Sequence, residues 1–159
     1  MSSHAESRVV GLDRVGGERL LWMGEPTLLK VTGEQTNGAY SLAEVFVSPA
    51  GEVPLHAHSR EDEAFYVLDG DITFEVGDET IEAGPGSFVF GPKGIPHRYT
   101  VNSATARVLM LFSPAGFENF IRATSVPTDS LEMPRPENVE IDWDQVAAAA
   151  AAYGAGILA

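Results

Sequence analysis

Residues 54–70 read PLHAHSREDEAFYVLDG and hold two of the four histidines of the chain, His56 and His58, with Glu63 shortly after them. Side chains two residues apart in a strand point to the same face, so the two imidazoles are expected to converge. Glu63 opens the apolar run EAFYVL, in which Phe65 shares its face. If that face is internal, an unpaired carboxylate there is costly, and a bound cation would remove much of the cost.

A third histidine, His97, stands in residues 84–101, which read GPGSFVFGPKGIPHRYTV. A strand over HRYTV would place His97 and Tyr99 on one face. Three imidazoles and one carboxylate form a mixed nitrogen and oxygen site that suits one divalent transition metal ion, Fe, Mn, Ni, Co or Zn. The alternative is that these histidines face solvent at strand ends and that Glu63 forms an ordinary surface ion pair.

Short apolar runs separated by Gly, Pro, Asn and Asp fill residues 8–112. Residues 71–75 alternate between polar and apolar, and Gly77-Asp78 is a hairpin signal whose order favours a type II′ turn. The pattern predicts an all-β fold, an antiparallel barrel or sandwich of the jelly-roll kind. The expected strands are LLWMG (20–24), TLLKV (27–31), YSLAEVFV (40–47), EAFYVLDG (63–70), DITFEVGDETIEAG (71–84), SFVFGP (87–92), HRYTV (97–101) and RVLMLF (107–112).

The histidine segments resemble the two motifs of the cupins, specifically the single-domain cupins. The first motif is Gly, five residues, HxH, three or four residues, Glu, six residues, Gly. The chain matches it from Gly51 to Gly70, with one residue fewer before His56. The spacing to Gly70 favours Glu63 as the acidic ligand over its neighbours Glu61 and Asp62.

The second cupin motif is Gly, five residues, Pro-x-Gly, two residues, His, three residues, Asn. The chain matches it from Gly86 through Pro92 and Gly94 to His97, but Val101 stands where the final Asn is expected. The likeness extends over most of residues 20–113. It implies a small β-barrel with a metal ion near one mouth, held by the ligands His56, His58, Glu63 and His97.

The inward strand faces are expected to supply an apolar and aromatic pocket above the metal. Within the cupins, the chain most resembles the quercetin dioxygenase-like proteins, which implies a metal-dependent dioxygenase acting on an enolic or phenolic small molecule. In that group the ligand carboxylate also deprotonates the substrate, and burial would raise the proton affinity of Glu63 for this task. Tyr99 is the second expected catalytic residue. The predicted pocket residues are Phe65, Phe74, Phe90 (or Phe88), Met110 and Phe112.

Two other functions use the same residues. One is a Lewis-acid enzyme, such as a cupin polyketide cyclase or isomerase, which needs no oxygen. The other is a cupin that binds a small molecule without catalysis. Oxygen consumption would distinguish the dioxygenase from these two functions. Turnover without oxygen would distinguish the Lewis-acid enzyme from the binding protein.

The chain is expected to divide into a flexible N-terminus (1–7), a cupin barrel with a packed helix (8–124) and a linker with an Ala-rich helix (125–159). Ser113 and Pro114 are expected to begin the packed helix as N-cap and first-turn residue. In the last part, Asp142 and Gln145 resemble a capping box and Gly154 ends the helix. The Ala-rich helix could cover the pocket, meet a neighbouring subunit or form a mobile tail, and its small side chains favour the tail.

The composition limits the partners and the location. The net charge of −13 repels phosphate backbones and anionic membranes, so nucleic acid and membrane partners are not expected. The chain has no cysteine, and its N-terminus lacks the apolar run of a signal peptide, which predicts a cytoplasmic location. Residues 107–112 are apolar on both faces, which favours a covered outer face, and cupins are commonly dimers; we therefore expect a homodimer.

Overall fold

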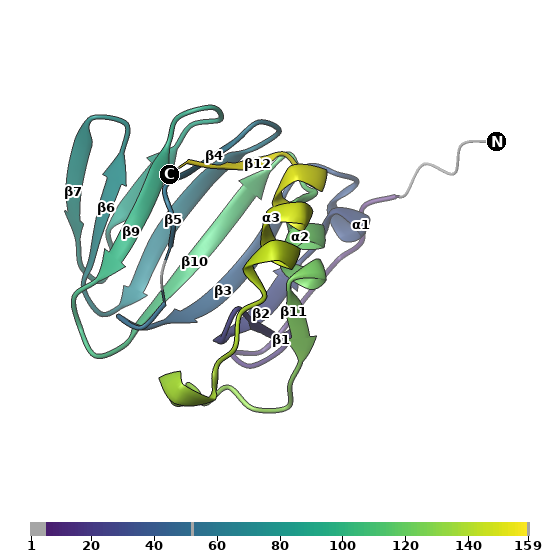
Figure 1. Cartoon of the computed structure of the whole chain (residues 1–159). Coiled ribbons are helices and arrows are strands. Elements are labelled where there is room, and N and C mark those ends of the chain that lie inside the picture. Colours follow the sequence, from purple (N-terminus) through teal and green to yellow (C-terminus); the bar gives the residue numbers. More distant parts are fainter. Residues whose placement is uncertain (1–5, 52, 159) are drawn as a thin grey trace.

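Two antiparallel β-sheets face one another in the computed structural model, which describes residues 6–51 and 53–158 (Figure 1). The expectation for residues 1–7 falls mainly on residues outside this range. In order across the first sheet, the strands are β11 (Ser125–Pro127), β1 (Glu18–Trp22), β2 (Glu25–Val31), β3 (Ser41–Val47), β10 (Ala106–Ser113), β5 (Asp62–Asp69) and β8 (Phe88–Gly91). The second sheet contains β12 (Ala155–Ile157), β4 (His56–His58), β9 (His97–Val101), β6 (Ile72–Val76) and β7 (Glu79–Ala83).

The core lies between the two sheets because the inward positions of each strand are apolar. Along β10, buried and partly exposed residues alternate, and Val108 and Met110 face inward beside Val67 and Phe65 of β5. This period of two residues is the pattern that predicted an antiparallel all-β fold, and the fold class is confirmed. The two sheets remain separate hydrogen-bonded units, so the barrel is not closed.

The hairpin between β6 and β7 turns at Gly77 and Asp78, as expected. Val76 pairs with Glu79, which leaves two residues for the turn, and Gly77 has a φ of 57°. Asp78 is not among the residues with positive φ, so only the first turn position needs the left-handed region. That requirement explains the Gly-first order of a type II′ turn.

The packed helix α2 (Phe117–Ala123) begins later than predicted. Ser113 is the last residue of β10, and its hydroxyl donates to the backbone carbonyl of Ala39 (3.0 Å) instead of capping a helix. Gly116 takes the N-cap position. The predicted face is nevertheless right, because Phe117, Phe120 and Ile121 are all buried.

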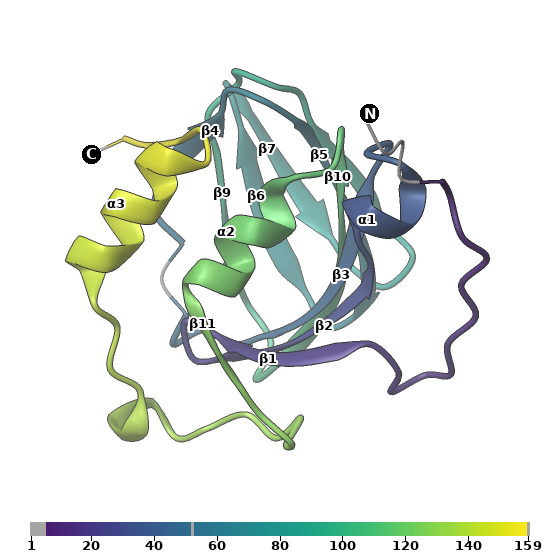
Figure 2. The ribbon, with the colours of Figure 1, turned by 90° about the vertical axis from the view of Figure 1, so that its right-hand side faces the viewer.

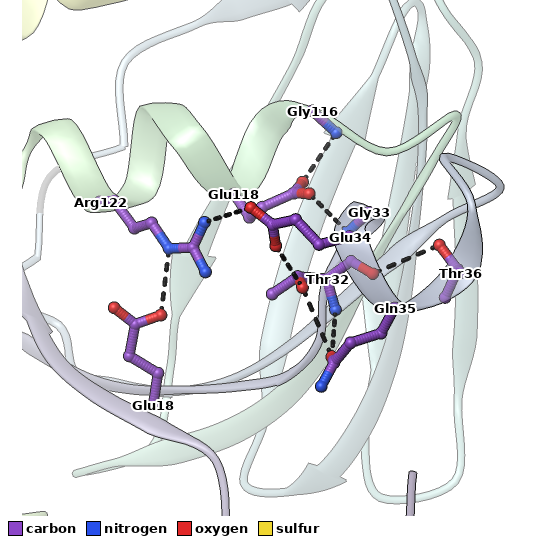
Figure 3. A network of polar contacts seen from close by, with 9 residues as sticks. All are labelled: Glu18, Thr32, Gly33, Glu34, Gln35, Thr36, Gly116, Glu118 and Arg122. Atoms are coloured by element: carbon purple, nitrogen blue, oxygen red, sulfur yellow. Dashed lines mark hydrogen bonds and ion pairs between the residues drawn. The ribbon is translucent and has the colours of Figure 1, made fainter. Parts of the chain in front are cut away.

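Glu118 fixes the start of α2 against α1 (Gly33–Thr36), a short helix that the sequence reading did not predict (Figure 3). Its carboxylate is buried and accepts hydrogen bonds from the backbone N–H groups of Gly33 (2.8 Å) and Gly116 (2.7 Å). On the exposed side of the same network, Arg122 contacts Glu34 at 3.4 Å. Charge-assisted hydrogen bonds are stronger than neutral ones, so Glu118 holds α2 in position.

Replacing Glu118 by alanine is therefore expected to lower the free energy of unfolding by about 1–3 kcal/mol, because two partly buried N–H groups lose a charged acceptor. Urea denaturation measures the change. Glu34→Ala is the matched control, since the Glu34 side chain is 61% exposed and its loss should change stability by about 0.5 kcal/mol at most. Equal effects of the two substitutions would contradict the assigned role of Glu118.

The C-terminal segment is part of the fold and not a mobile tail. Residues 125–141, expected to be an extended linker, contain β11 and the short 3-10 helix η1 (Pro136–Asn138). Asp142 caps α3 (Trp143–Ala152) as predicted, by accepting from the backbone N–H of Gln145 (3.1 Å), and Gly154 follows the helix with a φ of 78°. Helix α3 lies next to α2, and its Val146 is buried (Figures 1 and 2). After the helix, β12 pairs with β4.

None of the helices in the described residues is long and apolar enough to span a bilayer.

Candidate metal centre

The three predicted histidines and Glu63 come together between the two sheets. His56 and His58 lie on β4, and His56 pairs in register with His97 of the neighbouring β9. Glu63 comes from β5 of the opposite sheet. One nitrogen or oxygen atom from each residue lies within 4.8 Å of the others. His58, Glu63 and His97 are buried and His56 is partly buried, so the alternative of solvent-facing histidines is wrong.

The distances within the cluster suit a shared cation. Oε2 of Glu63 lies 2.9 Å from Nε2 of His58 and 3.0 Å from Nε2 of His97. The contact with His97 is a hydrogen bond, whereas the buried Nε2 of His58 has no hydrogen-bond partner among the described residues. An unpartnered buried nitrogen next to a carboxylate is costly unless a further group satisfies it. Three imidazoles and one carboxylate fit a divalent transition metal, so the residues present agree with a metal site.

A largely apolar pocket adjoins the cluster, and His56, Glu63 and His97 form part of its wall. The cavity itself is small, about 80 Å³. Phe65 and Met110, two of the expected pocket residues, line it, and so does Tyr99.

Three of the predicted pocket residues, Phe74, Phe90 and Phe112, lie elsewhere. Phe74 is buried behind the wall, with its ring centre 4.8 Å from that of Phe65. Phe90 is wrong as a pocket residue: it is 47% exposed on the outer face of β8. Because Phe90 pairs with Ala64, it shares the outward face of that residue, and the neighbouring Val89 points inward. The alternative, Phe88, is also exposed.

Phe112 is buried beside the cluster and does not line the pocket. Its ring centre lies 4.5 Å from that of Phe117 and 6.3 Å from that of His58. Most of the remaining wall residues were not predicted from the sequence. These residues include Trp22, Met23, Glu25, Phe117, Phe120, Ile141, Trp143, Val146 and Ala150.

Comparison with known proteins agrees with this geometry. A family model described as a cupin domain matches residues 43–112. An uncharacterized protein from Streptomyces coelicolor is 33% identical over 70 residues, which cover 44% of this chain and 67% of that protein. The chain belongs to the cupins.

Two further proteins resemble this cupin. Quercetin 2,3-dioxygenase from Bacillus subtilis is 24% identical over 127 residues, or 79% of this chain, but this chain spans only 38% of that enzyme. The solved structure of the polyketide cyclase RemF from Streptomyces resistomycificus matches with a TM-score of 0.57 and 24% identity, covering 67% of this cupin and 80% of that chain. The cupins it resembles thus include enzymes, and the structural match supports the fold.

The second ring nitrogen of each histidine is held by an acceptor outside the cluster. Hydrogen bonds of this kind orient the ring and leave the other nitrogen free to bind a metal. The Nδ1 contacts are His56 to the carbonyl of Pro54 (2.8 Å), His58 to Oε1 of Glu61 (2.7 Å) and His97 to the carbonyl of Ile95 (3.4 Å).

Glu61 and Asp62, the two competing acidic residues, lie outside the ligand cluster. Glu61 is buried and orients His58, whereas Asp62 accepts a hydrogen bond from the backbone N–H of Lys93 (2.8 Å).

We expect Glu61→Ala to lower metal affinity about 10- to 100-fold, because His58 loses the group that orients it. Isothermal titration with Mn²⁺ or Zn²⁺ measures this change. Asp62→Ala is the control and should bind metal like the wild type; a similar loss in both variants would contradict the role of Glu61.

The protonation state of Glu63 differs from the one expected from the sequence. Burial alone would raise the pKa of the Glu63 carboxyl, but the contacts with His58 and His97 hold that pKa well below its ordinary range. The expected high proton affinity of Glu63 is therefore wrong in this arrangement. Burial lowers the pKa of His56 to about 4, whereas the hydrogen bond to Glu61 and the nearby Glu63 carboxylate overcome the burial of His58 and raise its pKa to about 9.

Proposed function

We propose that this cupin is a metal-dependent oxygenase that acts on an enolic or phenolic small molecule bound in the apolar pocket. One observation carries the proposal: His56, Glu63 and His97 of the four-residue cluster form part of the wall of a pocket that is otherwise mainly apolar and aromatic. Such a pocket favours a flat, weakly polar molecule with a chelating oxygen. The similarity to quercetin 2,3-dioxygenase over most of this chain supports the same substrate class.

His56, His58, Glu63 and His97 would hold the metal ion, and Fe, Mn, Ni, Co and Zn all suit this donor set. When bound, a divalent ion with an open coordination position supplies Lewis acidity and a binding place for oxygen ligands. Glu63 is ionised at neutral pH, which favours its role as a ligand. The same low pKa makes it a weaker base than expected, so its role in deprotonating the substrate stays a prediction.

Tyr99 and the pocket walls would orient the substrate. Burial, with a smaller contribution from the acidic side chains of Glu25 and Glu63, holds the pKa of Tyr99 well above its ordinary value, so its hydroxyl stays protonated. A protonated phenol is a hydrogen-bond donor that can fix one oxygen of the substrate. Phe65 and Met110 form an apolar part of the wall, which would keep water away from the reacting end of the substrate.

Oxygen uptake tests the proposal. We expect protein loaded with Fe²⁺, Mn²⁺, Ni²⁺ or Co²⁺ to consume dioxygen when quercetin or a related enol is added, in step with the loss of the substrate absorbance. Protein treated with EDTA is the control and should consume none. Turnover of an enol under nitrogen would instead support the Lewis-acid cyclase or isomerase, and binding without turnover under either gas would support the binding protein.

The homodimer and the cytoplasmic location stay predictions. An aromatic surface on the outer face of the first sheet supports association with a second copy: Tyr66 of β5 pairs with Phe88 of β8, and both side chains are exposed. Phe90 adds to the same surface.

A further inference from the structure

Glu25, the first residue of β2, is a second carboxyl group in the pocket, and it does not belong to the ligand cluster. Its side chain is 7% exposed, and the ion pairs of the described residues do not include it. One carboxyl oxygen, Oε2, is buried and has no hydrogen-bond partner in that part of the chain. Buried polar atoms are rarely left without a partner, so this oxygen needs an explanation.

The environment of Glu25 favours the neutral acid. Burial raises the pKa of Glu25 to about 8, although a hydrogen bond with the backbone of Ser48 acts in the opposite direction. At neutral pH the group is therefore mainly a carboxylic acid, which can donate one hydrogen bond and accept others. The backbone of Gly51 lies close to it, because a Cβ atom at Gly51 would come within 2.9 Å of Oε2. The carboxyl group is thus confined between the pocket and the segment before β4.

The unpartnered oxygen and the pocket position point to one use. We propose that Glu25 is a second polar anchor for the ligand, a carboxylic acid that hydrogen-bonds an oxygen of the bound small molecule outside the metal centre. The ligand would then carry two separate oxygen functions, one for the histidine cluster and one for Glu25, and no net charge at the second position. For its ligand class, this inference rests on the proposed function.

Two flavonols test the anchor. Quercetin and 3-hydroxyflavone share the chelating hydroxyl and ketone, but only quercetin carries further hydroxyl groups. With Mn²⁺-loaded protein, we expect Glu25→Met to weaken quercetin binding three- to tenfold and to leave 3-hydroxyflavone binding within twofold, because only one ligand loses a hydrogen bond. Glu25→Gln, which keeps a donor and an acceptor, should retain the wild-type preference. Titration calorimetry measures both affinities, and an unchanged preference in Glu25→Met would overturn the proposal.

Thermal unfolding of the ligand-free proteins supplies a second measurement. If Glu25 serves the ligand, its buried oxygen destabilises the free protein, and Glu25→Met should raise Tm by about 2–8 °C. A lower or unchanged Tm would mean that Glu25 is a structural residue and would overturn the inference. If the wild type binds neither flavonol, the ligand class of the proposed function fails, and the Tm of Glu25→Met still decides for or against Glu25 as a ligand anchor.

Discussion

His97→Ala is expected to abolish stoichiometric metal binding, with a loss of affinity of at least about 100-fold. His97 is the ligand contributed by the second motif, and its Nε2 lies 3.0 Å from Glu63. Without it, three of the four ligands remain, and the buried Glu63 carboxylate loses one of its two histidine neighbours. Metal content after loading and dialysis measures the effect directly. A Tm shift on adding metal provides an independent readout, because a ligand that binds only the folded state raises Tm.

The fourth histidine of the chain provides the matched control, because His4 stands outside both motifs. His4→Ala should bind one metal ion per chain and show the wild-type rise in Tm. If His97→Ala still binds one metal ion with wild-type affinity, the cluster is not the metal site, and the proposed oxygenase loses its physical basis. A loss of metal in both variants would indicate non-specific binding by histidine.

Sequence reasoning succeeded where the signal is local. Alternation along β10 and β6 follows directly from the two faces of a strand, and the Gly77-Asp78 turn needs only its own two residues. The convergence of His56 and His58 depends on the same period of two residues. Joining them to His97 needed the cupin motif, because residues distant in sequence become neighbours only through strand pairing.

The incorrect predictions concern features for which the local sequence is compatible with two structures. Phe88, Val89 and Phe90 are all apolar, so their sequence does not say which side faces inward. Pairing of Glu63 with Gly91 decides it, and that register is a contact between distant parts of the chain. Glu63 is a similar case: burial alone predicts a high proton affinity, and only the positions of His58 and His97 reverse the direction.

The Ala-rich helix α3 provides the second prediction with a large effect. Val146 and Ala150 of α3 are buried and line the pocket, whereas Ala147 and Ala148 on the same helix are exposed. The double variant Val146→Asp/Ala150→Asp is expected to detach the helix, because burying two unpaired carboxylates costs several kcal/mol. The pocket would then open, with a rise in fluorescence of the apolar dye ANS and at least a tenfold loss of quercetin affinity.

The double variant Ala147→Asp/Ala148→Asp adds the same two charges to the exposed side of α3 and should keep wild-type dye and quercetin binding. The comparison also tests the connection to the metal centre. Since β12 follows α3 and pairs with β4, which carries His56 and His58, detachment removes one neighbour of the ligand strand and should lower metal affinity as well. A mobile tail would make the two double variants indistinguishable. That result would mean that the pocket is closed by something other than α3.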